Sequence, residues 1–219
     1  MLVLVLDTAT PAVTAAVAAV GSDGTVTIAA ERSVVDGKAH GELLAPQIAG
    51  ALDGAGATVR DLHAIVAGLG PGPFTGLRVG LVTAASMSDT LGIPAYGVCS
   101  LDALGAATTG DALVATDARR REVYWATYHN GERVSGPAVA KPAEVDAGDA
   151  DHAVGEGALK YADQLGLAVT AEASAYPRAE WLARLAADRV LAGAPTERLT
   201  PLYLRRPDAV EPGMPKKVS

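Results

Sequence analysis

Apolar and polar positions alternate in short blocks at the start of the chain and predict three consecutive strands. Residues 2–6 form a continuous apolar run, which is typical of a strand buried on both faces. Turn-forming residues follow at 7–11 and again at 21–24, where Gly-Ser-Asp-Gly indicates a hairpin. We therefore expect strands at 12–20 and 25–32 that pair antiparallel.

The spacing changes to that of a helix between residues 38 and 52. Leu44, Ile48 and Leu52 recur at every fourth position, which places them on one helical face. Pro46 lies in the same segment, and a proline in an ideal helix interior costs about 3 kcal/mol. We therefore expect the helix to begin or to kink near Pro46.

Strands and helices alternate from this point. The pattern predicts a strand at 64–69 and, after Thr75, a helix of about fifteen residues that ends near Gly92. A strand at 96–98 and a helix capped by Ser100 follow. The first half thus has three strands and then alternating helices and strands.

A second series of elements begins after residues 108–110. The chain is therefore expected to be an α/β protein with a first lobe at 1–108 and a reduced second lobe at 109–219, whose basic tail from Arg205 is loosely ordered. The elements expected in the second lobe are strands at 112–116, 122–128, 152–155 and 201–204, helices at 157–165 and 178–191, and an irregular connection at 135–152.

Composition limits the classes of partner. Of the 219 residues, 49% are hydrophobic and only 4% aromatic, which suits helices packed closely on strands. The net charge of −7 disfavours direct, unaided binding of nucleic acid. The single cysteine, Cys99, excludes an intramolecular disulfide, and no apolar run approaches the roughly 20 residues that cross a bilayer. We expect a cytoplasmic protein without membrane contact.

The sequence GPGPFTGLRVG at 70–80 is a glycine-rich loop between a strand and a helix. Such a loop can present backbone amides to an anion at the helix N-terminus. It differs from both GxxxxGK[ST] and GxGxxG, and its two prolines remove amide donors. Three interpretations stay open: a phosphate loop, a rigid turn that positions the following helix, and a surface for another protein.

The turn Asp7-Thr8-Ala9-Thr10 after the first strand is a second candidate. A D-x-G-[TS] turn in this place approaches phosphates and magnesium in actin-like and sugar-kinase-like folds, but Ala9 stands where that pattern has glycine. A plain turn at the end of a strand is the alternative. The candidate nucleotide-binding residues are Asp7, Thr8, Thr10, Gly70 and Gly72.

Other chemistry-bearing residues are scattered. The four histidines show no metal-binding spacing, so we expect neither a metal site nor a cofactor. His40 with Glu42 is either an acid/base pair or a solvated helix end, and Cys99 without a local basic partner is expected to be structural. The arginines at 119–121 and 205–206 are solvated faces or, alternatively, a local contact with an anion or RNA.

Six segments in order carry a resemblance that spans nearly the whole chain. They are L-x-L-D-T-A-T at 4–10, H-x-x-L-L-x-P at 40–46, GPGPFTGLRVG at 70–80, I-P-x-Y-G-V at 93–98, D-A-R-x-x-E-V-Y-W-A at 117–126 and P-L-Y-L-R at 201–205. Together they resemble the bacterial TsaB family, also called YeaZ, of tRNA threonylcarbamoyladenosine biosynthesis proteins. Pro73 departs from the serine that the family more often has.

The resemblance implies a fold and a pathway. The fold is actin-like and sugar-kinase-like (ASKHA), with two ribonuclease-H-like lobes of mixed sheets flanked by helices. The pathway places threonylcarbamoyl on the adenosine next to the anticodon of tRNAs that read codons beginning with A. In it the catalytic relative TsaD transfers the group, TsaB binds TsaD, and a small ATPase, TsaE, joins them.

The resemblance also implies that this chain is not an enzyme. TsaD-like proteins follow the I-P-x-x-x-V strand with N-H-x-x-x-H, whose histidines hold the catalytic metal. Here Cys99, Ser100 and Leu104 occupy those positions, and neither serine nor leucine can replace an imidazole ligand. A scaffold and activator is the favoured function, a weak or vestigial ATP-binding protein is the alternative, and a metal-independent peptidase is less favoured.

The same resemblance predicts an interface. In the family, the helix after H-x-x-L-L and the helix after GPG-x-FTG meet TsaD, or a second TsaB when TsaD is absent, and tRNA is bound only within the complex. We expect charged residues at Leu77 and Met87 to block binding of TsaD and to leave the fold intact. The residues expected on or just under this face are His40, Leu44, Ile48, Phe74, Thr75, Leu77, Arg78, Val79 and Met87.

Overall fold

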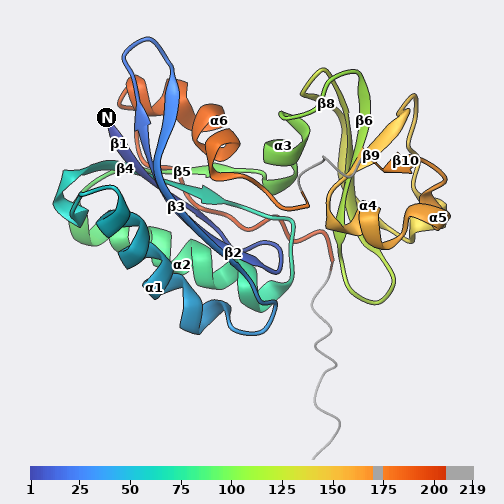
Figure 1. The fold of residues 1–219 in the computed structure, drawn as a ribbon, viewed down its shortest axis with the longest axis horizontal. Coiled ribbons are helices and arrows are strands. Elements are labelled where there is room, and N and C mark those ends of the chain that lie inside the picture. The colour runs from blue at the N-terminus through green and yellow to red at the C-terminus, as the bar shows by residue number, and fades with distance from the viewer. Residues whose placement is uncertain (170–174, 206–219) are drawn as a thin grey trace, which may run out of the picture.

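The computed structural model describes residues 1–169 and 175–205 and has two lobes, each built on a five-stranded sheet (Figure 1). The strands are β1 (Leu2–Asp7), β2 (Ala12–Val20), β3 (Val26–Val35), β4 (Leu62–Gly68), β5 (Ala95–Val98), β6 (Asp111–Asp117), β7 (Val123–His129), β8 (Glu132–Ala140), β9 (His152–Val154) and β10 (Ala168–Val169). The helices are α1 (His40–Gly54), α2 (Phe74–Leu91), α3 (Ser100–Gly105), α4 (Glu156–Lys160), α5 (Ala162–Leu165) and α6 (Ala179–Leu191), with 3-10 turns at Val59–Asp61 and Pro142–Glu144.

The two sheets share one topology. The first has the order β3-β2-β1-β4-β5, and the second has the corresponding order β8-β7-β6-β9-β10. In each sheet the three successive strands pair antiparallel, and the other two run parallel to the first strand of the set. The expected α/β architecture of two lobes with mixed sheets is confirmed.

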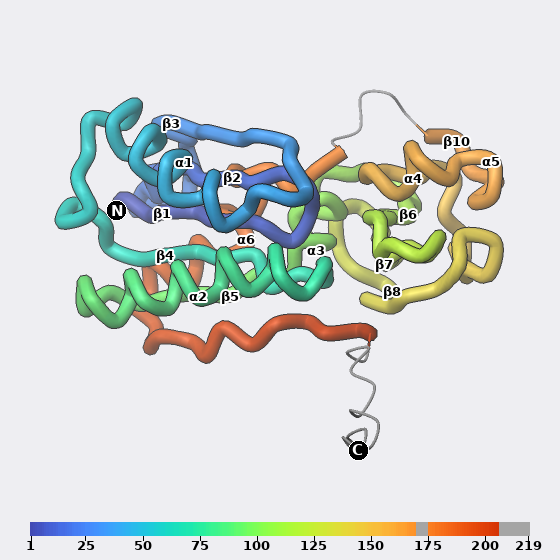
Figure 2. Tube along the Cα trace, turned by 90° about the horizontal axis from the view of Figure 1, so that it is seen from below, coloured from blue at the N-terminus to red at the C-terminus, as the bar shows by residue number. Residues whose placement is uncertain are grey.

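Both faces of the first sheet are covered by helices. Helices α1 and α2 lie on one face and α6 lies on the other (Figures 1 and 2). Successive side chains of a strand point to opposite faces, so β1 supplies both cores. Leu4 and Leu6 pack toward α1 and α2, whereas Val3 and Val5 pack toward α6.

The position of α6 differs from the sequence-based division at residue 108. This helix falls in the range 109–219, yet its buried residues belong to the core of the first sheet. The chain then returns along the first lobe through residues 194–205, here called the strap, which runs alongside α2 in Figure 2. Leu202 N–H donates to the Leu69 carbonyl, but the strap forms no strand, so the predicted strand at 201–204 is wrong.

Two other predictions change in detail. The connection expected at 135–152 contains most of β8, an edge strand whose Gly136 and Pro137 hide the strand pattern, because proline is tolerated at sheet edges. The helix α1 begins at His40 and contains Pro46 on its exposed side.

The tail beyond Arg205, expected to be loosely ordered and basic, lies outside the described residues. Within residues 1–169 and 175–205, no helix is both long enough and apolar enough to cross a membrane.

The packing of α6 predicts unequal effects of two leucine substitutions on the same helix. Leu182 is buried against the first sheet, whereas Leu185 is exposed. We expect Leu182→Ala to lower the free energy of unfolding by about 2–5 kcal/mol, because it leaves a cavity. Leu185→Ala should lower it by less than about 1 kcal/mol. Urea unfolding measures both, and equal losses would contradict the packing of α6 on the first lobe.

Candidate functional site

Three segments meet at the carboxyl end of β1 and are joined by Ser100. The Ser100 hydroxyl donates to Asp7 Oδ2 at 2.6 Å and accepts the Gly70 amide at 3.2 Å. The Ser100 amide donates to the Gly70 carbonyl at 2.8 Å. One side chain at the start of α3 therefore connects the end of β1 with the glycine loop before α2.

The glycine loop lies directly against the turn that follows β1. A Cβ on Gly72 would overlap the Ala9 carbonyl, so only glycine permits this approach. Thr8 Oγ1 donates to the Gly76 carbonyl at 2.8 Å and accepts the Gly80 amide at 3.1 Å. The loop and the first turns of α2 are therefore fixed on the strand end.

His40 attaches α1 to the same turn. Its Nε2 lies 2.8 Å from the Thr10 carbonyl, so this nitrogen carries the proton and donates. His40 is buried, whereas Glu42 is exposed. The hydrogen bond explains His40 as a structural residue, and the acid/base pair with Glu42 stays a prediction.

The carboxyl group of Asp7 is enclosed by this junction. Burial raises the pKa of Asp7 to about 6, against the hydrogen bonds from Ser100 and the Ala9 amide and the charge of His40, which lower it. Thr10 Oγ1 accepts the Ala12 amide. Polar atoms of Asp7, Thr8, Thr10 and Gly70 that would meet a phosphate are thus hydrogen-bonded within the protein, and Gly72 lies against the Ala9 carbonyl. The nucleotide site stays a prediction, and these bonds weigh against it.

The expected interface residues lie at different depths of the α1–α2 layer. Leu44, Ile48 and Leu77 belong to the core between these helices and the sheet, and Leu77 is 0% exposed. A charged residue at Leu77 would therefore disrupt the fold, so this part of the predicted interface test is wrong. Val79 and Met87 are half-buried, and Phe74, Thr75 and Arg78 are exposed.

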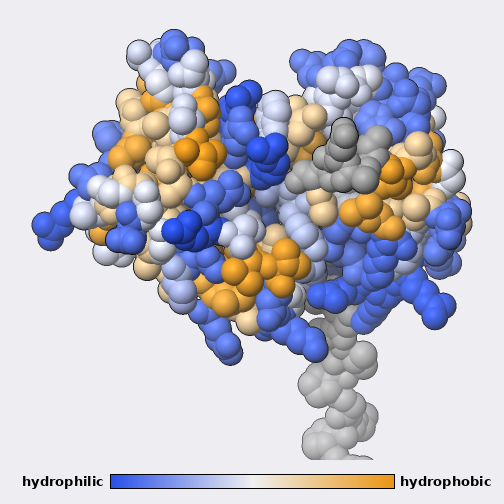
Figure 3. Space-filling model, in the orientation of Figure 1, coloured by the Kyte–Doolittle hydropathy of each residue, from blue (hydrophilic) through white to orange (hydrophobic). Residues whose placement is uncertain are grey.

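The outer face of α1 and α2 contains residues that the sequence analysis missed. Val82 is 63% exposed and follows Arg78 by four residues, a spacing that could have revealed it. Ala45 and Ala49 on α1 and Ala85 on α2 are exposed as well. Figure 3 shows a further hydrophobic patch over the end of β3 beside the beginning of α1, where Val34 and Val35 are exposed.

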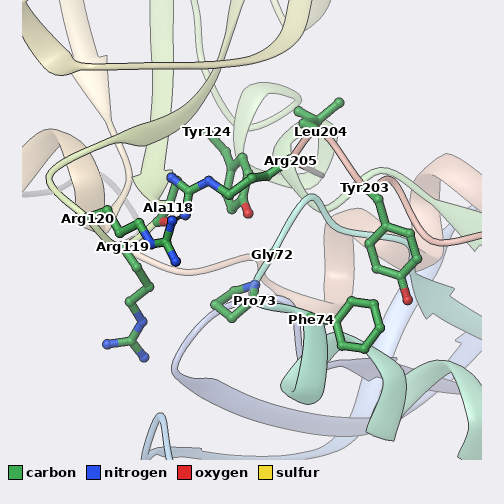
Figure 4. Close-up of a pocket in the computed structure, with 10 residues that line it drawn as sticks. All are labelled: Gly72, Pro73, Phe74, Ala118, Arg119, Arg120, Tyr124, Tyr203, Leu204 and Arg205. Atoms are coloured by element: carbon green, nitrogen blue, oxygen red, sulfur yellow. Dashed lines mark hydrogen bonds between the residues drawn. The ribbon is translucent and has the colours of Figure 1, made fainter. Parts of the chain in front are cut away.

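A cavity of about 380 Å³ lies between the two lobes (Figure 4). At one end the rings of Phe74 and Tyr203 stack with centroids 5.1 Å apart, and the Arg78 guanidinium lies 3.8 Å above the Phe74 ring. Arg78 Nε also donates to the Tyr203 hydroxyl at 2.8 Å. The residues that line the cavity are Gly72, Pro73, Phe74, Ala118, Arg119, Arg120, Tyr124, Tyr203, Leu204 and Arg205.

The other end of the cavity is formed by the turn between β6 and β7. Arg119, Arg120 and Arg121 have φ angles of 62°, 53° and 61°, so three consecutive residues other than glycine are left-handed. Such a conformation costs on the order of 1–3 kcal/mol per residue and persists only where the surroundings enforce it. Here the Glu122 amide donates to the Arg119 carbonyl, and Arg205 donates to the Ala118 carbonyl. The strap thereby fixes this turn at residues 119–121, here called the arginine turn.

Burial of Asp7 predicts a pH-dependent stability. Because its pKa is about 6 in the folded chain and 3.8 when the carboxyl is surrounded by water, the folded state binds an extra proton between these values. The stabilisation from that proton is complete below pH 3.8 and is lost as the pH rises through 6, an effect of about 3 kcal/mol. Asp7→Asn should remove this part of the pH dependence.

Chemical unfolding of both proteins between pH 4 and pH 8 measures the difference. The same substitution at the exposed Asp53 of α1 controls for the change from Asp to Asn. A free-energy difference between wild type and Asp7→Asn that does not vary with pH would show that Asp7 is not buried in this way.

Comparisons with known proteins agree with this architecture. Residues 34–197 match the family model described as TsaD, tRNA N6-adenosine threonylcarbamoyltransferase. The chain is 49% identical over 208 residues to the uncharacterized protein ML0378 of Mycobacterium leprae, which is 95% of this chain but 56% of that relative. It is 35% identical over 137 residues to the tRNA threonylcarbamoyladenosine biosynthesis protein TsaB of Escherichia coli, which is 60% of this chain and 57% of that protein.

A solved structure covers nearly the whole chain. YeaZ from Pseudomonas aeruginosa superimposes with a TM-score of 0.75 at 30% identity, over 93% of this chain and 99% of YeaZ. The expected actin-like, sugar-kinase-like fold of two lobes is confirmed. The chain belongs to the TsaB/YeaZ family of tRNA threonylcarbamoyladenosine biosynthesis proteins.

Proposed function

We propose that this chain is the non-catalytic subunit that binds and activates TsaD, together with TsaE, in the cytoplasm. The reaction is threonylcarbamoylation of the adenosine next to the anticodon of tRNAs that read codons beginning with A. The observation that carries the proposal concerns the two positions where TsaD-like chains have metal-binding histidines. In this chain, Ser100 occupies the first position and donates a hydrogen bond to Asp7, and Leu104 occupies the second and is buried in the core around α3.

The neighbouring groups support the same conclusion. Burial raises the pKa of the Cys99 thiol to about 11, which opposes formation of a nucleophilic thiolate. The Asp7 carboxyl is enclosed by the glycine loop. A subunit whose polar groups are used in this way contributes to the reaction through its surface.

The surface that we assign to TsaD is the outer face of α1 and α2. Small residues there, Ala45 and Ala49 on α1 and Ala85 on α2, allow the helices of a partner to approach closely. Val82 lies in the same face and supplies exposed apolar area. The same face would pair two copies of this chain when TsaD is absent.

Charge placed on this face should block the partner. We expect Val82→Asp to reduce recovery of co-expressed TsaD at least about tenfold, because a carboxylate would be desolvated in the interface. The matched control is Val134→Asp on β8, since Val134 is 69% exposed and lies in the other lobe. Thermal unfolding of both variants separates loss of binding from loss of fold.

The outcome of this comparison is decisive for the assigned face. Equal recovery of TsaD by wild type and Val82→Asp would reject the face. Loss of modified tRNA when purified Val82→Asp replaces wild type in a reconstituted reaction, with Val134→Asp active, would support both the face and the activating role.

The alternative function as an ATP-binding protein is tested by calorimetry. We expect no heat of binding when ATP and magnesium are titrated into the isolated chain, because Asp7 and Thr8 are engaged in internal hydrogen bonds. Binding with a dissociation constant below about 1 mM, abolished by Asp7→Asn, would favour the alternative, since such an affinity is worth about 4 kcal/mol.

A further inference from the structure

The arginine turn and the aromatic pair face one cavity from opposite lobes. We propose that this cavity, here called the basic cleft, and the arginine turn at its edge bind an unpaired segment of RNA. A base would lie on the ring pair of Phe74 and Tyr203, and phosphates would lie at Arg119, which lines the cavity, and at Arg121, which follows in the same turn just outside the lining. The inference rests on the proposed function, because that function supplies an RNA with an unpaired loop as the partner.

Charge is unevenly distributed on this chain. Its net charge is −7, and several arginines outside the basic cleft pair with carboxylates, as Arg184 does with Glu180 and Arg189 with Glu197. Among the described residues, no carboxylate lies within ion-pair distance of Arg119 or Arg121. These two guanidinium groups are therefore available to an external anion, such as a phosphate.

Two of the acidic groups beside the turn are already paired with other cations, and the third, Glu156, attracts Arg119 but has its pKa raised to about 7, mainly by burial. Glu122 pairs with Arg205, and Asp117 pairs with Lys160 at 2.9 Å. Charges elsewhere on the surface act weakly, since the Debye length is about 8 Å at physiological ionic strength. The net charge of the chain therefore does not prevent phosphate binding at the turn.

The backbone of the turn is already ordered for binding. Its left-handed conformation is fixed by the hydrogen bonds at Ala118, Arg119 and Glu122 and by the strap residue Arg205. The Arg119 guanidinium also reaches the turn before α1, where a Cβ on Gly37 would lie 3.1 Å from it. A fixed backbone loses less entropy when the side chains bind phosphate.

The aromatic end favours an unpaired base over a paired one. Phe74 and Tyr203 are both exposed and lie side by side (Figure 4). Arg78 contacts both residues, with its guanidinium over the Phe74 ring and its Nε donating to the Tyr203 hydroxyl. Proteins read RNA mainly where bases are unstacked and can lie on aromatic rings or guanidinium planes. A cavity of about 380 Å³ is in the range of small-ligand sites, about 300–1,000 Å³, and suits one nucleotide of such a segment.

The test uses the full chain, alone and with TsaD added, and a labelled RNA hairpin with an unpaired loop. We expect Arg119→Ser with Arg121→Ser to weaken binding about tenfold and to lower the slope of log K against log salt by about 1.4, the value for two lost phosphate contacts. Arg119→Lys with Arg121→Lys should keep most of the RNA affinity and most of the salt slope of the wild type, because lysine keeps the positive charge that binds phosphate.

The matched control removes two positive charges elsewhere on the first lobe. Arg60→Ser with Arg198→Ser should leave the affinity unchanged, since both residues are exposed and neither lines the basic cleft or belongs to the arginine turn. Tyr203→Leu should reduce the preference for the looped hairpin over a fully paired duplex about tenfold.

The outcomes separate this inference from the proposed function. Equal RNA affinity of wild type and the Arg119 and Arg121 serine variant, with or without TsaD, overturns the basic cleft, as does a complete lack of RNA binding in both titrations. Recovery of TsaD by the serine variant is measured in parallel. Normal recovery with unchanged RNA affinity would reject the basic cleft alone, whereas failure of wild type to recover TsaD would reject the proposed function.

Discussion

The hydrogen bond between Ser100 and the buried carboxyl of Asp7 is the contact on which the first lobe depends. It joins the end of β1 to the start of α3, and Ser100 also binds both backbone groups of Gly70. A buried carboxyl is costly unless it is hydrogen-bonded, so the loops must close over it in one arrangement. An acidic residue at a strand end, which in an open cleft could bind a cation, is here a fixed point of the structure. The direction of α2 and the outer face that it shares with α1 follow from this point.

The two lobes use one topology for different purposes. After β4 the first lobe has the long helix α2, whereas after β9 the second lobe has only the short helices α4 and α5. Within residues 109–169 and 175–205, the second lobe therefore has no broad helical face on its sheet, and it offers the turn between β6 and β7 instead. Helix α6 and the strap return to the first lobe, and Arg205 at the end of the strap holds the turn in place. The second lobe is thus smaller than the first, and the strap still connects the two lobes through the hydrogen bond from Arg205 to Ala118.

Local patterns in the sequence predicted most of the first lobe, because the apolar run of β1 and the hairpin turn are local signals. These local patterns failed where a residue's burial depends on contacts with segments far away in the sequence. Periodicity shows that Leu77 shares a helix with Met87, but it does not show which side of α2 meets the sheet, and Leu77 is on that side. Likewise, nothing local in α6 says that it packs on strands far earlier in the chain. The sequence shows the arginine turn only as a basic run. Its left-handed backbone depends on Arg205 of the strap, and the aromatic pair across the cavity depends on Tyr203 of the strap.

The two proposed surfaces meet at the beginning of α2. Phe74 is the first residue of that helix and lies at the edge of the basic cleft, and it also lines a second cavity of about 410 Å³ beside His40 and Val79, next to α1. A partner bound to α1 and α2 would therefore contact residues that border the RNA site. Binding at two adjoining sites is coupled reciprocally: if TsaD strengthens RNA binding by a given factor, RNA strengthens TsaD binding by the same factor. An activating subunit without catalytic groups can act in this way, because the coupling free energy between its two sites raises the affinity of each site when the other is occupied.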